Sequence, residues 1–241
     1  MIIKVCGMRD AENIREVAQL GVDALGLIFY PKSPRCVRDL TGMGQTLKRT
    51  DADMHIPRVG VFVNDTLENI VIQIIRYDLD VIQLHGDEEP EMAEDIKQAL
   101  AEALDLLCSE VQKKQGLAKK PQLEKTVQVC KAISVSSAED IQKYKEYVGA
   151  VDFFLFDTKC ESKGGSGQQF DWSVLDAYDG DVPFLLSGGI GPDDAERVKA
   201  FKHPLCFGID INSKFEIEPG LKDVEKIKNF LEIVKKKNNN E

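Results

Sequence analysis

The sequence predicts an α/β fold, a single (β/α)8 barrel that spans residues 1–241 as one domain. Eight short apolar runs alternate with helical patterns along the whole chain, and this strict alternation is typical of such barrels. Most of the runs are almost continuously apolar, as expected for parallel strands covered on both faces. No linker divides the chain, and its length suits one barrel. The alternative, a doubly wound open sheet, usually has fewer strands at this length.

The expected strands are short and rich in β-branched and aromatic residues. In chain order they are residues 2–6 (IIKVC), 24–29 (ALGLIF), 58–63 (RVGVFV), 80–84 (DVIQL), 127–133 (VQVCKAI), 152–157 (DFFLFD), 183–187 (PFLLS) and 206–209 (CFGI).

Helical patterns separate these runs. Asp10 can cap the first helix, and Gly21 can end it. Ser136 and Glu139 have the spacing of a capping box, and Pro192 opens a helix whose first turn is acidic. Further apolar residues recur with helical spacing after residues 65 and 90, and a last helix is expected over residues 224–236.

Two segments depart from this regular pattern. Residues 105–126 are a long, lysine-rich excursion before the fifth strand. Because the excursion leads into the start of a strand, we expect it at the amino-terminal end of the barrel, solvated and away from any active site. The tail at 237–241 is expected to be frayed.

Composition limits the classes of function. The formal net charge is −10 with a pI near 5.0, which argues against nucleic acid as the main partner. No apolar run reaches the length of a membrane span, and no signal-peptide pattern is present. The six cysteines form no CxxC pair, so we expect no structural metal and no disulfide framework. These features predict a cytoplasmic protein with reduced thiols.

Functional side chains of such barrels lie at the carboxyl ends of the strands. Cys6 ends the first run, Arg35 follows the second, Gln83 and His85 lie at the end of the fourth, and Asp157 ends the sixth. We therefore expect these five side chains around one barrel mouth, with Asp210 joining them from the eighth strand. A lone histidine there is more often a structural or ligand-contacting group than a catalyst.

Glycines after the last two strands predict a phosphate site. Backbone N–H groups near glycine can approach an anion closely, and the loops after strands seven and eight build the usual phosphate site of these barrels. The alternative is a pair of tight turns. The long glycine-rich loop at 158–172 could fold over a ligand, or could simply be flexible. The candidate phosphate-binding residues are Gly188, Gly189, Gly208, Asn212 and Ser213.

Several motifs together closely resemble the phosphoribosylanthranilate isomerase family, and their order and spacing are more specific than any one of them. Two features depart from it: the excursion at 105–126, and SKFE at 213–216, where members commonly read SGVE. The matching motifs are KVCGMRD (4–10), SPR (33–35), QLHGDE (83–88), FDTK (156–159), GGSGQQFDW (164–172), LSGGI (186–190), GIDINSKFE (208–216) and PGLKD (219–223).

The resemblance implies an Amadori rearrangement in tryptophan biosynthesis, which needs no metal or organic cofactor. N-(5'-phosphoribosyl)anthranilate would become 1-(2-carboxyphenylamino)-1-deoxyribulose 5-phosphate, with Cys6 matching the general base of the family and Asp157 its general acid. A thiol suits the base if its pKa is modestly lowered. The acid must hold a proton, which burial among apolar residues favours. Arg35 is the candidate for the anthranilate carboxylate, and Asp210 either orients sugar hydroxyls or supports the acid–base pair.

Three alternatives remain at this stage. The related isomerase of histidine biosynthesis carries an Asp where Cys6 stands, and its two-phosphate substrate would suit the acidic loop HGDEEP poorly. A catalytically silent barrel would bind a phosphorylated metabolite without turnover. A scaffold for a partner protein would expose a large apolar patch. Both a monomer and a homodimer are compatible with the sequence.

Overall fold

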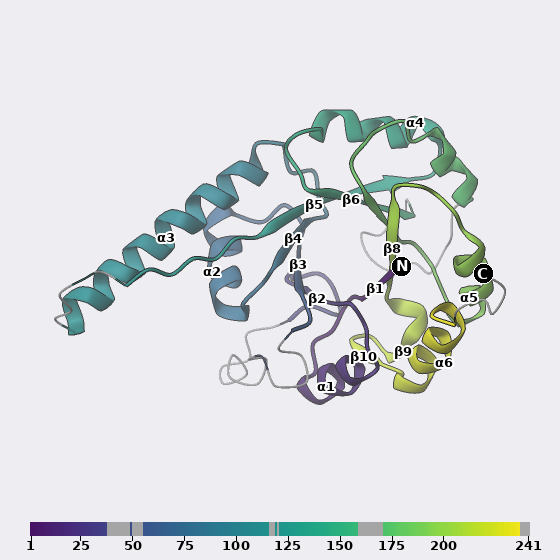
Figure 1. The fold of residues 1–241 in the computed structure, drawn as a ribbon, viewed down its shortest axis with the longest axis horizontal. Coiled ribbons are helices and arrows are strands. Elements are labelled where there is room, and N and C mark those ends of the chain that lie inside the picture. The colour runs from purple at the N-terminus through teal and green to yellow at the C-terminus, as the bar shows by residue number, and fades with distance from the viewer. Residues whose placement is uncertain (38–48, 50–54, 116–118, 120, 159–170, 237–241) are drawn as a thin grey trace.

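The eight expected strands form a closed parallel barrel, in the order β1 to β8 with β8 paired to β1 (Figure 1). The computed structural model describes residues 1–37, 49, 55–115, 119, 121–158 and 171–236. The strands are β1 (Ile2–Val5), β2 (Ala24–Ile28), β3 (Arg58–Phe62), β4 (Val81–Leu84), β5 (Gln128–Val135), β6 (Phe153–Thr158), β7 (Phe184–Leu186) and β8 (Cys206–Ile211).

Helices and 3₁₀ turns surround the barrel (Figure 1). On the side of β5 to β7 they are short. The elements are α1 (Ala11–Gln19), α2 (Leu67–Tyr77), α3 (Met92–Gln115), α4 (Ala138–Ile141), η2 (Gln142–Tyr147), η3 (Trp172–Ala177), η4 (Pro192–Asp194), α5 (Ala195–Ala200), η5 (Ser213–Phe215) and α6 (Val224–Val234), with a small hairpin of β9 (Glu216–Glu218) and β10 (Leu221–Lys222) after β8.

The caps agree with the sequence at the first helix and differ at the fourth. The Asp10 carboxylate accepts the Asn13 N–H at 2.8 Å, as predicted for α1. The predicted capping box of Ser136 and Glu139 is wrong by one residue, because Ser137 is the N-cap and the Asp140 carboxylate accepts backbone N–H groups in front of the helix. Two adjacent serines followed by two adjacent acids allow both registers, and packing selects one.

The apolar core has two parts. The larger lies between the strands and the surrounding helices. The smaller fills the barrel interior and draws one or two residues from each of β2 to β7: Ala24, Val59, Val81, Cys130, Ala132, Leu155 and Leu185. It forms a floor beneath the carboxyl ends of the strands, and the polar side chains described below stand on it.

Helix α3 is the longest element, and its carboxyl-terminal part projects away from the barrel (Figure 1). The first half of the predicted excursion, residues 105–115, thus continues this helix. Leu106 and Leu107 on it are exposed, whereas Cys108 is buried. Residues 121–126 return to β5 at the amino-terminal end of the barrel, where Lys125 pairs with Asp78 and Asp80. The tail at 237–241 lies outside the described residues.

Candidate active site

Strand alternation decides which side chains enter the barrel. On β1, Ile3 and Val5 belong to the outer core beneath the helices, so Lys4 and Cys6 point inward. The same alternation on β4 sends Gln83 and His85 inward. On β6 it sends Asp157 inward.

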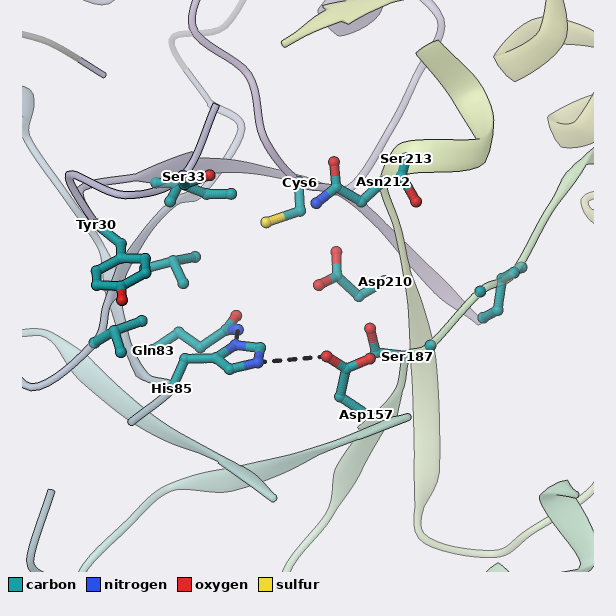
Figure 2. A pocket seen from close by; sticks show the side chains of 16 residues that line it. Cys6, Tyr30, Ser33, Gln83, His85, Asp157, Ser187, Asp210, Asn212 and Ser213 are labelled. Atoms are coloured by element: carbon teal, nitrogen blue, oxygen red, sulfur yellow. Dashed lines mark hydrogen bonds and ion pairs between the residues drawn. The ribbon is translucent and has the colours of Figure 1, made fainter. Parts of the chain in front are cut away.

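Apart from Lys4, these inward side chains line one pocket that opens to solvent at the carboxyl ends of the strands. Figure 2 shows Cys6 and Asp157 on different sides of this pocket, with Asp210 between them. The lining residues are Cys6, Ile28, Tyr30, Ser33, Val61, Val63, Gln83, His85, Asp157, Ser187, Gly188, Gly189, Ile190, Asp210, Asn212 and Ser213.

The thiol of Cys6 is buried at the base of the pocket, with 4% of the residue exposed. Burial raises the pKa of the Cys6 thiol, while the positive charges of Lys4 and Lys222 lower it in part. The net direction is upward, so the expectation of a modestly lowered thiol pKa is wrong. The physical reason is that removing a thiolate from water here outweighs the attraction of the two nearby ammonium groups.

Asp157 faces His85 across the pocket. Nε2 of His85 lies 3.3 Å from Oδ2 of Asp157, and each side chain is about one-quarter exposed (Figure 2). On the other side of the imidazole ring, Nδ1 of His85 lies 2.7 Å from Nε2 of the Gln83 amide. The structure thus brings Gln83, His85 and Asp157 together, as the strand-end argument predicts.

Lys4 is the buried cation of the site, 1% exposed. Its Nζ donates to Oδ2 of Asp210 and to Oε1 of Gln83, each at 2.8 Å. Burial alone would lower the pKa of Lys4, but the charge of Asp210 raises it above its ordinary value. Lys4 and Asp210 are paired in the β1–β8 register, so barrel closure itself brings the two charges together.

One carboxylate oxygen of Asp210 has no hydrogen-bond partner among the described residues. It is the buried Oδ1, because Oδ2 binds Lys4. Burial raises the pKa of Asp210, and the charge of Lys4 opposes that rise. A buried acceptor without a partner is uncommon, and this one belongs to a residue that lines the pocket.

A second buried ion pair anchors the loop that carries His85. Nζ of Lys131 donates to the Gly86 carbonyl at 2.8 Å and to Glu88 at 2.9 Å. The Glu88 carboxylate also accepts the backbone N–H of Asn64 and of Gly86. The Glu88 carboxylate therefore links the loop after β3 to the loop after β4.

Arg35 is placed differently from the expectation. It does not line the pocket; its guanidinium is buried against Glu216, with Nε–Oε1 at 2.8 Å and Nη2–Oε2 at 2.7 Å. Nζ of Lys222 donates to the same carboxylate at 2.6 Å and to Asn212 at 2.7 Å. Nη1 of Arg35 makes no hydrogen bond to any residue in the described part of the chain.

The predicted phosphate residues divide into two groups. Gly188, Gly189, Asn212 and Ser213 all line the pocket, and both glycines have the positive φ angles of 99° and 64° that other residues rarely adopt. Gly208 does not line the pocket; it lies within β8, paired with Ile2 at the start of β1, where a Cβ would stand 2.4 Å from the Ile2 carbonyl oxygen. The structure therefore contradicts a phosphate role for Gly208. A glycine is needed at this position because β8 approaches β1 too closely for a Cβ.

Sequence reasoning missed Lys4, Glu216 and Lys222 as parts of the site. Lys4 carried a usable signal, because it is the one charged residue in an apolar strand and shares the face of Cys6 two positions later. Glu216 and Lys222 follow β8 in the hairpin of β9 and β10, and only the tertiary structure returns that hairpin to the barrel mouth. The long loop predicted to cover a ligand falls largely on residues 159–170, outside the described residues.

Among the described residues, no cluster of three or more His, Cys, Asp or Glu side chains is arranged to hold a metal ion. No helix among these residues is long and apolar enough to cross a membrane.

Comparison with known proteins decides the family. The profile of the N-(5'-phosphoribosyl)anthranilate isomerase family matches residues 3–122 and 109–233. The chain belongs to this family. It is 46% identical to the N-(5'-phosphoribosyl)anthranilate isomerase of Parabacteroides distasonis over 96% of this chain and 92% of that protein, and 40% identical to that of Phocaeicola vulgatus over 98% and 99%.

Solved structures of the family share the fold. The phosphoribosylanthranilate isomerase of Thermotoga maritima superposes with a TM-score of 0.70 at 28% identity, over 98% of this chain and 99% of that one. A complex of the isomerase with reduced 1-(o-carboxyphenylamino)-1-deoxyribulose 5-phosphate gives a TM-score of 0.68 at 27% identity, with the same coverage.

Proposed function

We propose that the pocket lined by Cys6 and Asp157 is the active site of the isomerisation, with Cys6 as general base and Asp157 as general acid. The protein is an isomerase of the aldose–ketose class in tryptophan biosynthesis, acting on N-(5'-phosphoribosyl)anthranilate. The observation that carries the residue roles is the placement of these two proton-handling groups on different sides of one pocket (Figure 2).

The first step opens the sugar ring. Asp157 gives its proton to the furanose oxygen, the bond from that oxygen to C1 breaks, and the nitrogen lone pair forms a C1–N double bond. The product of this step is an open-chain iminium ion, and Asp157 is left as a carboxylate. Its contact with Nε2 of His85 at 3.3 Å supports the carboxylate at that stage.

The second step moves the hydrogen from C2. The iminium withdraws electrons and acidifies the C2–H bond, so a thiolate can remove this proton. The electron pair of the bond then forms a C1–C2 double bond, and the nitrogen becomes neutral. The resulting enolamine tautomerises to the aminoketose by gaining a proton at C1 and losing the one on the C2 hydroxyl, so that no atom or electron is gained overall.

Burial of Cys6 is compatible with this role because of the charge that develops beside it. Burial raises the pKa of the thiol, which favours its protonated form. A cationic iminium next to the sulfur favours the charged form of a thiol, as any nearby positive charge does. The thiol then gives its own proton to solvent in the open pocket, and the base becomes effective when the ring has opened.

The remaining contacts suit a phosphorylated substrate. The turn at Gly188 and Gly189, together with Ser213, is proposed to bind the phosphate through backbone N–H groups. The unpartnered Oδ1 of Asp210 is proposed to accept a hydrogen bond from a sugar hydroxyl. Nη1 of Arg35 is proposed to bind the anthranilate carboxylate, with Glu216 fixing the orientation of the guanidinium.

The cysteines and the substrate bear on where the enzyme works and on what it binds. No disulfide joins any two of the five described cysteines, which agrees with our proposal of a cytoplasmic enzyme. Its partner is a phosphorylated small molecule, with no nucleic acid, metal or organic cofactor required by the steps above. Monomer and homodimer remain alternatives, and one solved relative from Thermotoga maritima is described as monomers generated from a dimeric enzyme.

The decisive experiment removes each proposed catalytic group. Because general acids and bases contribute about 10²–10⁴-fold each, Cys6→Ala and Asp157→Asn should lower kcat by at least 10²-fold while both variants stay folded. Turnover is followed by the loss of fluorescence of enzymatically generated phosphoribosylanthranilate. Cys206→Ala, which removes a thiol outside the pocket, is the matched control. Near-normal turnover of Cys6→Ala would return Cys6 to the role of a buried apolar residue.

A further inference from the structure

We propose that Lys4 and Gln83 are positioning residues that fix the tautomer of His85, so that its Nε2–H points at the carboxylate of Asp157. The effect on turnover rests on the proposed role of Asp157, whereas the tautomer itself does not. The proposal follows from a continuous series of side-chain contacts that crosses the barrel from β8 to β6.

The orientation of the Gln83 amide is the first step. Nζ of Lys4 lies 2.8 Å from one end of that amide, and an ammonium group can only donate hydrogen bonds. The end that faces Lys4 must therefore be Oε1. Asp210 holds Lys4 in this position through its own bond of 2.8 Å, and all three side chains are buried.

The tautomer of His85 follows from that orientation. With Oε1 turned to Lys4, the NH₂ group of Gln83 faces Nδ1 of His85 at 2.7 Å. The NH₂ group is a donor only, so Nδ1 has to accept. A neutral imidazole carries its single hydrogen on the other nitrogen, which here is Nε2, 3.3 Å from Oδ2 of Asp157.

The direction of this hydrogen bond affects the proposed acid. A donor at Nε2 holds the Asp157 carboxylate in one rotamer at the pocket wall, and it stabilises the charge left after proton transfer. The opposite tautomer would turn a lone pair toward that carboxylate, and the two acceptors would repel each other. Lys4 therefore acts on Asp157 through Gln83 and His85, without contacting the substrate.

The Gln83→Glu substitution tests the series because it keeps the shape of the side chain and reverses one contact. Glutamate still offers an oxygen to Lys4, but it presents a second acceptor to Nδ1 of His85. Nδ1 must then carry a hydrogen. Gln73→Glu makes the same chemical change on helix α2, outside the pocket, and serves as the matched control.

The readout is the protonation state of the imidazole nitrogens, measured by long-range ¹H–¹⁵N correlation NMR on the purified enzyme. The chain has three histidines, and the signals of His85 are those lost in His85→Asn. In the wild type and in Gln73→Glu we expect Nε2 protonated and Nδ1 unprotonated. In Gln83→Glu we expect Nδ1 to be protonated and kcat to fall at least about tenfold, a part of the general-acid contribution, with a much smaller change in KM.

Two results would overturn the proposal: a hydrogen on Nδ1 in the wild type, or an unprotonated Nδ1 in folded Gln83→Glu. If Gln83→Glu fails to fold, the wild-type spectrum alone decides. If instead Asp157→Asn retains full turnover while the tautomer is as expected, the assignment of the acid is wrong and the positioning of His85 stands.

Discussion

At the scale of the residue, the environment of Cys6 makes a prediction about pH. The thiol is buried and its pKa is raised, while Lys4 lowers it in part. Alkylation by iodoacetamide requires the thiolate, so its rate at Cys6 should increase with pH through a midpoint above the ordinary thiol value of about 8.5. A bound phosphorylated product analogue should protect the thiol.

Replacing Lys4 should move that midpoint further up. Lys4→Met removes the cation that lowers the thiol pKa and leaves the charge of Asp210, which raises it. Both changes act in the same direction. The pH profile of alkylation, measured by mass spectrometry of the peptide that contains Cys6, should shift to higher pH. An unchanged or lower midpoint would show that Lys4 does not act on the thiol.

Arg35 belongs to the same scale and affects both binding and stability. Arg35→Ala should raise KM for the substrate, because a charge-assisted contact contributes roughly 1.5–3 kcal/mol. The buried pairing with Glu216 means that the variant should also unfold at a lower denaturant concentration. Lys222 still contacts Glu216, so the carboxylate is not left alone. Unchanged kinetics in a folded variant would remove Arg35 from the substrate site.

At the scale of the element, the buried pair of Lys131 and Glu88 holds the loop after β4 that carries His85. Breaking a buried ion pair costs about 3–5 kcal/mol, so Lys131→Met should lower the free energy of unfolding by roughly that amount. The double variant Lys131→Met with Glu88→Leu should recover part of the stability, because neither charge is left unpaired. Its turnover should stay low, since the loop has still lost its anchor. Urea unfolding and the fluorescence assay separate the two effects.

The loops after β7 and β8 make a prediction of their own. A phosphate-bearing substrate analogue should contact backbone N–H groups near Gly188, Gly189 and Ser213. A crystal structure of that complex is the direct measurement. A phosphate bound at the amino-terminal end of the barrel, near Gly208, would contradict the proposed site.

At the scale of the whole molecule, closure of the barrel depends on the approach of β8 to β1. A Cβ at Gly208 would meet the Ile2 carbonyl oxygen at 2.4 Å and the Ile2 Cβ at 2.8 Å. Gly208→Ala should therefore destabilise the fold by about 1–3 kcal/mol, the usual range for overpacking. Gly191→Ala, whose added atom would stay at least 3.5 Å from its neighbours, is the control, with a Tm close to that of the wild type. Equal melting temperatures would argue against this account of closure.

Sequence patterns alone determined the alternation of strands and helices, and with it the closed barrel. The period of two along a strand also placed Cys6, His85 and Asp157 in one mouth, because inward and outward positions alternate whatever the surroundings. These are local properties, which follow from the backbone geometry of parallel strands.

Only the tertiary structure decided how the charged groups pair. Arg35 and Glu216 are 181 positions apart, and Lys4 and Asp210 are 206 apart, so no local pattern could predict either contact. The direction of the shift in the Cys6 pKa likewise depends on the balance between burial and the charges that closure brings near. Residue type and strand position predict which groups reach the pocket. Their partners and charge states depend on distances and burial that exist only when the barrel has closed.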